Sequence, residues 1–100
     1  MNDEPLSENE KIIDLREDLY LAIGEKCYAN GQKWGGPEHD DRHSRRDWIA
    51  FIVRQLGDAE NFCDCIAMDE YQEQMIAVAA LAIQAIESVD RIWARRETKE

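Results

Sequence analysis

Cationic residues are scarce in this sequence relative to acidic ones. Twelve Lys and Arg residues stand against 22 Asp and Glu residues among the 100, so the formal net charge is −10 at pH 7. Such a surface repels phosphates, and we therefore expect neither nucleic acid nor an anionic membrane as a partner. The charge suits solubility, cations or a basic protein partner.

Cysteine is also sparse, with three residues at Cys27, Cys63 and Cys65. An odd count does not suit a disulfide framework, and Cys63 and Cys65 lie too close along one expected helix to be bridged. We therefore expect reduced thiols and a cytoplasmic protein. No apolar run is long enough for a membrane span, and the acidic first residues are unlike a signal peptide.

Sustained alternation of polar and apolar residues, the pattern of β-strands, is absent, and so is any internal repeat. Hydrophobic residues make up 44% of the chain, and a chain of this length buries roughly two-thirds of its unfolded surface. The sequence predicts one all-α domain over residues 1–100, with residues 1–7 frayed.

Apolar residues recur at three- and four-residue steps in three stretches, which predicts helices over about residues 7–30, 45–66 and 69–96. Small residues let a neighbouring helix approach closely, so the Ala-rich third helix is expected to form the centre of a bundle or a dimer seam. We expect a three-helix, bundle-like domain that homodimerisation completes, with dimer or tetramer left open. The alanines concerned are Ala77, Ala79, Ala80, Ala82 and Ala85.

A corner separates the first two expected helices, because Gly35, Gly36 and Pro37 interrupt a helix there and force the first one to stop near Trp34. Ser44 is expected to cap the next helix and to form a capping box with Asp47. The flanking residues His43 and Trp48 are expected to form a hydrophobic staple. The corner should therefore have a defined shape.

The corner sequence His39-Asp40-Asp41-Arg42-His43 offers imidazoles and carboxylates, which suit divalent transition metals. Its spacing matches no strong zinc template. We favour the interpretation that these side chains cap and pin the loop, and whether His39 and His43 bind metal stays open.

Two further groups of side chains have possible chemistry. Cys63 and Cys65 diverge on a helix, so they would not share one ion easily, and nothing supports a catalytic pair of Cys63 with a histidine. Acidic side chains on the later helices would bind Mg²⁺ only if several faced one groove, whereas charges on helices more often form the solvated face. These are Asp58, Glu60, Asp64, Asp69, Glu70 and Glu73.

The segment Gln32-Lys33-Trp34-Gly35, followed by His39, an acidic loop and a helix opening at Asp47-Trp48, resembles phage and bacterial MazG-like proteins. The similarity continues through residues 56–59, 74–80 and 86–91, and so covers most of the chain after Gln32. MazG-like proteins are all-α nucleoside triphosphate pyrophosphohydrolases.

The resemblance implies a metal site that this sequence has largely lost. In the family, a Glu-Glu-x-x-Glu motif and a Glu-x-x-Asp motif bind Mg²⁺ at the triphosphate, and water attacks between the α- and β-phosphates. Here the first motif falls on Arg54, Gln55 and Asp58, and the second on Gln74 and Ala77. Only Asp58 keeps a carboxylate, and one carboxylate scarcely compensates the charge of Mg²⁺.

The resemblance favours a catalytically weak or inactive protein that binds a nucleotide or regulates a partner. Its ligand pocket would use Trp34 for stacking and Lys33 for phosphate charge, with His39 and Trp48 nearby, although a structural role is the stronger interpretation for Trp48. Two alternatives remain open. One is an active Mg²⁺-dependent pyrophosphohydrolase with rearranged ligands, Asp58, Glu70 and Glu73; the other is an acidic inhibitor that covers a basic surface of another protein.

Overall fold

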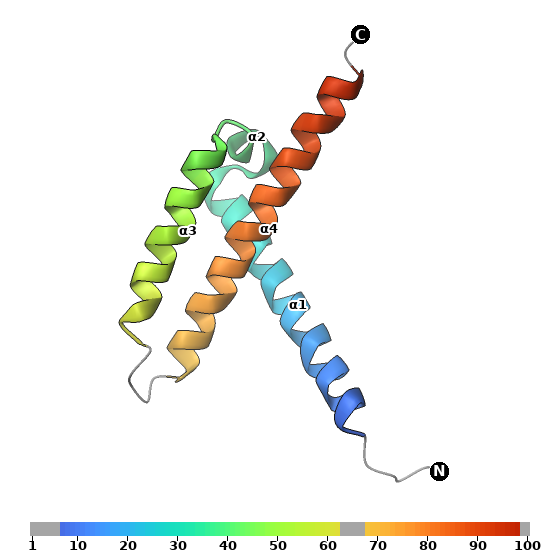
Figure 1. The fold of residues 1–100 in the computed structure, drawn as a ribbon, viewed down its shortest axis with the longest axis vertical. Coiled ribbons are helices and arrows are strands. Elements are labelled where there is room, and N and C mark those ends of the chain that lie inside the picture. Colours follow the sequence, from blue (N-terminus) through green and yellow to red (C-terminus); the bar gives the residue numbers. More distant parts are fainter. Residues whose placement is uncertain (1–6, 63–67, 99–100) are drawn as a thin grey trace.

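The computed structural model describes residues 7–62 and 68–98, and every regular element in that part of the chain is a helix (Figure 1). The predicted all-α class is confirmed. None of these helices combines the length and the apolar character that crossing a bilayer requires. The elements in chain order are α1 (Glu8–Trp34), α2 (Gly36–Asp40), α3 (Arg45–Glu60) and α4 (Met68–Thr98).

The boundaries correct the prediction in three places. The first helix continues past residue 30 to Trp34, because Gly31 is tolerated inside it and the chain turns only at Gly35, whose φ is +116°. The corner holds the short helix α2, where Pro37 in the first turn loses no intrahelical hydrogen bond. The helix α3 ends at Glu60 instead of near residue 66; Cys63 and Cys65 lie outside the described residues.

The start of α3 confirms the predicted capping box. The Ser44 hydroxyl accepts from the Asp47 N–H at 3.1 Å, and the Asp47 carboxylate accepts from the Ser44 N–H at 2.9 Å. This backbone donor lowers the pKa of the Asp47 carboxyl. The predicted staple is also present, since the His43 and Trp48 rings lie 6.0 Å apart.

The Ala-rich helix α4 lies at the centre of the fold and contacts α1, α2 and α3. Its Ala80 has no exposed surface, and the Cys27 thiol of α1 lies 3.7 Å from the Ala80 carbonyl oxygen, to which it donates. Burial, and then the nearby carboxylates of Glu87 and Asp40, raise the pKa of this thiol. Of the two roles expected for the alanines, a place at the centre of the bundle is confirmed.

The helices pack openly. The first half of α1 diverges from α3 and α4 (Figure 1), and the chain extends over 58 × 39 × 21 Å. The radius of gyration is 17.4 Å, whereas a compact domain of this length has about 13 Å. Among the described residues the buried apolar core is small and consists of Ile23, Trp48, Ala59 and Ala80.

Candidate functional site

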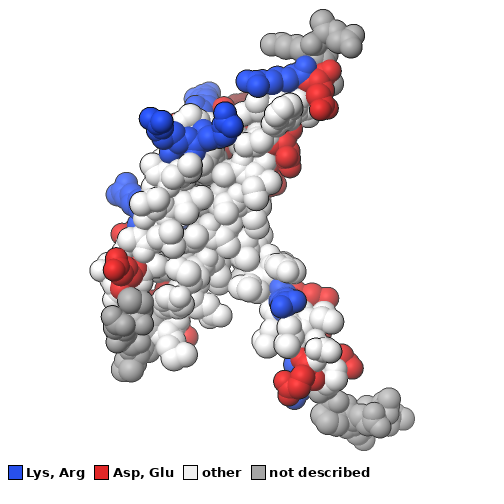
Figure 2. All heavy atoms as spheres, in the orientation of Figure 1, with Lys and Arg blue, Asp and Glu red and all other residues white. Residues whose placement is uncertain are grey.

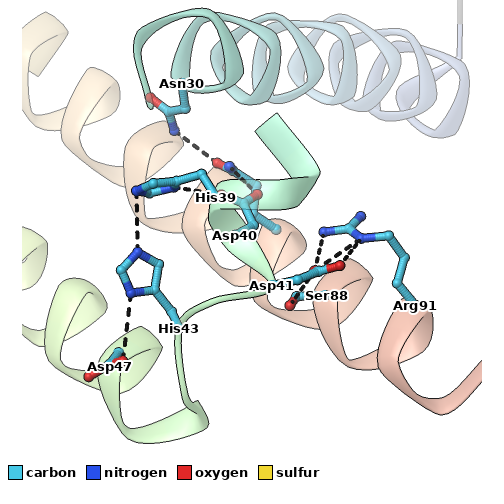
Figure 3. A network of polar contacts seen from close by, with 9 residues as sticks. Asn30, His39, Asp40, Asp41, His43, Asp47, Ser88 and Arg91 are labelled. Atoms are coloured by element: carbon cyan, nitrogen blue, oxygen red, sulfur yellow. Dashed lines mark hydrogen bonds and ion pairs between the residues drawn. The ribbon is translucent and has the colours of Figure 1, made fainter. Parts of the chain in front are cut away.

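The corner is fixed to the central helix by two adjacent carboxylates of α2 and the turn after it. The buried Asp40 accepts from the Gln84 amide at 3.1 Å, and Gln84 in turn accepts from the Asn30 amide at 2.9 Å. This line of hydrogen bonds joins α1, α4 and α2. In Figure 3, Asn30 lies at one end of the line and Asp40 at the other. A buried amide and carboxylate that satisfy each other stabilise one arrangement of the helices.

Asp41 is the strongest anchor of the corner. It accepts from the Ser88 hydroxyl at 2.8 Å and from Arg91 Nε and Nη2 at 3.1 and 3.0 Å (Figure 3). It also accepts from Arg95. Only 8% of its side chain is exposed, so these bonds lie in a poorly solvated place. The Arg91 hydrogen bond, helped by those of Ser88 and Arg95, keeps the pKa of the Asp41 carboxyl below its ordinary value. The interpretation that Asp40 and Asp41 pin the loop is confirmed.

The partners on α4 were missed at the sequence level. Gln84, Ser88, Arg91 and Arg95 follow one another at steps of four, three and four residues, so they form a polar stripe on a largely apolar helix. Near the C-terminal end of a helix, Arg91 and Arg95 suit the helix dipole, and the sequence alone gives no sign that they reach Asp41. A polar stripe beside the apolar seam of a helix is the signal that would have found them.

A line of contacting rings runs through the corner and includes the residues predicted to bind a ligand. Trp34 stacks on His39 at 6.2 Å, His39 meets His43 at 4.7 Å, and His43 meets Trp48 at 6.0 Å. The Lys33 ammonium lies 4.9 Å from the centre of the Trp34 ring. His43, absent from the predicted pocket, therefore connects its members.

The two ends of this line differ in accessibility. Trp34 is 58% exposed, so its ring is open to a stacking ligand, whereas Trp48 is 6% exposed and belongs to the core. His39 and His43 lie between them, with their Nε2 atoms 3.3 Å apart (Figure 3). Each histidine also has a carboxylate neighbour: His39 Nδ1 is 3.4 Å from Asp40 and His43 Nδ1 is 3.6 Å from Asp47.

The residues at the expected metal positions do not form a set of anionic ligands. Gln55 of α3 donates directly to Gln74 of α4, so the two amides satisfy each other across the helix interface. Arg54 brings a cation, and Ala77 has no donor atom. These side chains do not fit Mg²⁺, which requires oxygen ligands with negative charge.

The alternative Mg²⁺ ligands Asp58, Glu70 and Glu73 are all exposed, Asp58 on α3 and the other two at the beginning of α4. Within residues 7–62 and 68–98, no three side chains of His, Cys, Asp or Glu gather to hold a metal ion. The site in this part of the chain is therefore a corner of stacked rings pinned by carboxylates.

Comparison of the chain with protein-family models, with curated proteins and with solved structures finds no match in any of the three.

Proposed function

We propose that this chain is a catalytically weak or inactive MazG-like protein that acts as a nucleotide-binding or regulatory module in a homodimer. The observation that carries the proposal is the hydrogen bond between Gln55 and Gln74. It joins two neutral amides at positions where the resemblance expects carboxylates on either side of a Mg²⁺ ion.

The chemistry of this pair opposes metal-dependent hydrolysis. A hard divalent cation is held by several carboxylates and by substrate phosphates, which together compensate its charge. Two amides that bond to each other supply no charge, and Arg54 adds a positive one. The interface between α3 and α4 is thereby stabilised without an ion, which suits a scaffold that binds but does not hydrolyse.

The homodimer is supported by the surface that one chain leaves uncovered. The chain exposes 8434 Å², against about 5,800 Å² expected for a compact protein of 11.6 kDa. The excess of about 2,600 Å² exceeds the roughly 800 Å² that each partner buries in a standard interface. Exposed apolar side chains of the first half of α1 contribute to it, among them Ile12, Ile13, Leu15, Leu19 and Leu21.

A second copy of the chain is the partner that we propose covers this excess surface. An apolar groove of about 580 Å³ lies where the first half of α1 leaves the other helices, and Leu19 and Ile23 line it together with residues of early α4, including Met75 and Ile76. An apolar arm and an apolar groove on the same chain are complementary between two copies related by a two-fold axis. Their mutual burial would enlarge the small core of the single chain.

The proposed nucleotide-binding site depends on Trp34 and Lys33. The exposed indole offers a face for a nucleobase, and the ammonium above it offers charge to a phosphate. In this reading Trp34→Ala abolishes the nucleotide-induced rise in melting temperature. Tyr28→Ala, which removes another exposed ring of the same helix, leaves that rise unchanged.

The proposed loss of the metal site is tested with a variant that places carboxylates at the positions where the resemblance expects them. The variant carries Arg54→Glu, Gln55→Glu, Gln74→Glu and Ala77→Asp. Without metal its clustered carboxylates repel one another and lower its melting temperature; saturating Mg²⁺ stabilises it, by about 2.7 kcal/mol at 100 times the dissociation constant. The wild type should not respond to Mg²⁺.

The control variant adds carboxylates at exposed positions of the same helices, through Ala50→Glu and Ala94→Glu. It should not respond to Mg²⁺ either. A wild-type response as large as that of the restored variant would overturn the proposal and favour an active hydrolase. Loss of that response in Asp58→Ala would then place the metal on the alternative ligand set.

A further inference from the structure

We propose that His39 and His43 form a two-imidazole site for a divalent transition-metal ion, with Zn²⁺ as the ion that fits best. The two residues are four apart in sequence, His39 in α2 and His43 in the turn before α3. The site is defined by the four nitrogen atoms of these two rings. It depends neither on nucleotide binding nor on a homodimer.

The two Nε2 atoms have the separation that a tetrahedral metal ion requires. They lie 3.3 Å apart, whereas the ring centroids of His39 and His43 are 4.7 Å apart, so these nitrogens face each other (Figure 3). Zn²⁺ binds imidazole nitrogens at about 2.0–2.1 Å, and a tetrahedral angle then separates two of them by about 3.3–3.4 Å. Square-planar coordination, which Cu²⁺ prefers, brings neighbouring nitrogens to about 2.9 Å. The observed separation therefore favours Zn²⁺.

The other nitrogen of each ring faces a carboxylate. His39 Nδ1 lies 3.4 Å from Asp40, and His43 Nδ1 lies 3.6 Å from Asp47. A carboxylate beside Nδ1 favours the tautomer that keeps its proton there and leaves the Nε2 lone pair free for a metal ion. Histidines that bind metal ions almost always have such a partner, and both rings of this pair have one.

The number of protons on the pair points to a cation between the rings. Two neutral imidazoles carry two N–H protons in total. When both protons are on Nδ1, beside the carboxylates, two Nε2 lone pairs meet across 3.3 Å and repel each other. A positive ion between the two nitrogens replaces this repulsion with attraction. The unfavourable contact is an observation separate from the residue spacing, and it is relieved by a bound cation.

Neighbouring groups hold the two imidazoles in place before an ion binds. Trp34 stacks on His39, and Phe51 meets His43 edge-on with ring centroids 5.0 Å apart. In the turn between the two residues, the His43 N–H donates to the Asp40 carbonyl oxygen at 3.2 Å. Ligands that are already positioned lose little conformational freedom on binding.

The pair is open to solvent on one side. The side chains of His39 and His43 are 35% and 26% exposed, so an ion can reach them from solvent. Within residues 7–62 and 68–98 no third side chain of His, Cys, Asp or Glu completes a metal-binding group. The remaining coordination positions of the ion are therefore left for water or for a donor atom of a small molecule.

The experiment is a titration of the full chain with zinc chloride, followed in NMR spectra that detect the ring nitrogens. The chain carries Cys63→Ser and Cys65→Ser, because free thiolates bind Zn²⁺ themselves. We expect one Zn²⁺ per chain, with the Nε2 signals of His39 and His43 moving along one binding curve while each Nδ1 keeps its proton. This measurement identifies the bound nitrogens without any change to the histidines.

The acidity of the chain requires a control for non-specific attraction of cations. Figure 2 shows acidic side chains on the first half of α1 and towards the end of α4, away from the corner. Mg²⁺ carries the same charge as Zn²⁺ but prefers oxygen ligands. It should leave the imidazole nitrogen signals in place at the concentrations at which Zn²⁺ saturates them.

Isothermal titration calorimetry gives the dissociation constants of the variants. His39→Gln and His43→Gln should each weaken Zn²⁺ binding by about 100-fold or more, since losing a group that only orients a ligand already costs about 10- to 100-fold. Glu38→Gln is the matched control, because it removes an exposed carboxylate beside His39, and its dissociation constant should stay within about twofold of that of the parent chain.

Three results would overturn the proposal. One is the absence of any movement of the Nε2 signals with Zn²⁺, which would leave a shared proton as the cation between the rings. The second is coordination through Nδ1. The third is a loss of affinity in Glu38→Gln as large as in the two histidine variants, which would assign the binding to general negative charge.

Discussion

Replacing Leu15 with Arg is expected to break the proposed homodimer. Leu15 is 68% exposed on the half of α1 that diverges from the other helices, so the single chain does not need it for its own packing. If a second copy covers this stripe, the substitution places a guanidinium in the middle of an apolar interface.

The size of the effect follows from the exposed fraction and the symmetry. Full burial of a leucine side chain contributes about 1.5–3 kcal/mol, and 68% of this side chain is still available for burial. A two-fold dimer contains the position twice. The loss is therefore about 2–4 kcal/mol before the cost of burying the charge, which raises the dissociation constant about 30- to 1,000-fold.

Sedimentation equilibrium over a range of protein concentrations measures that constant. Asp14→Arg is the control, since it adds a cation to the same exposed arm at a position whose neighbours three and four residues away are all charged, namely Glu10, Lys11, Glu17 and Asp18. Helical content from circular dichroism should be the same in both variants. A wild type that stays monomeric, or a Leu15→Arg dimer as tight as that of Asp14→Arg, would refute the reasoning.

Three further predictions concern the corner and the core. Asp41→Asn should lower the free energy of unfolding at pH 7 by about 3 kcal/mol, because it weakens hydrogen bonds to charged groups. The pKa of Asp41 is lower in the folded protein than in the unfolded chain, so its contribution is present above the unfolded pKa of about 3.9 and disappears as the pH falls through the folded pKa. Urea unfolding at fixed protein concentration should show a smaller acid-induced loss in Asp41→Asn than in the wild type; equal losses would contradict this assignment. Ser44→Ala should lower the free energy of unfolding by about 1 kcal/mol and so lower the melting temperature. Ser44→Asp should restore most of the lost stability. An unchanged melting temperature in Ser44→Ala would contradict a stabilising role for this cap. In a Cys63→Ser, Cys65→Ser background, Cys27 should react with iodoacetamide more slowly than free cysteine at pH 8, because burial raises the pKa of its thiol; a rate equal to that of free cysteine would argue against this burial.

Local rules were sufficient for much of the fold. The three long helices follow from the apolar period, and the capping box of Ser44 and Asp47 depends on residues three apart, so both can be read from sequence. The short helix α2 could not be predicted, because five residues hold little more than one turn and show no period. The end of α1 at Trp34 follows from the break at Gly35, Gly36 and Pro37, whereas the range read from the apolar period stopped short of it, near residue 30.

The anchoring of the corner depends on partners that are distant in sequence. The bond from Arg91 to Asp41 spans 50 residues, and that from Gln84 to Asp40 spans 44. Periodicity places each polar residue on a face of its helix but does not say which face meets which. The same limit applies to the apolar residues of α1, whose period predicts a helix but does not say what covers Leu15, which the single chain leaves exposed.

The measurement that tests the central claim most directly is the release of pyrophosphate from a panel of nucleoside and deoxynucleoside triphosphates in the presence of Mg²⁺. Under the proposed MazG-like resemblance, Gln55, Gln74 and Ala77 stand where carboxylates would be needed, and the proposal therefore predicts no release above the rate without protein. Clear turnover that EDTA abolishes would contradict the account, and would mean that other carboxylates of the chain form a working metal site.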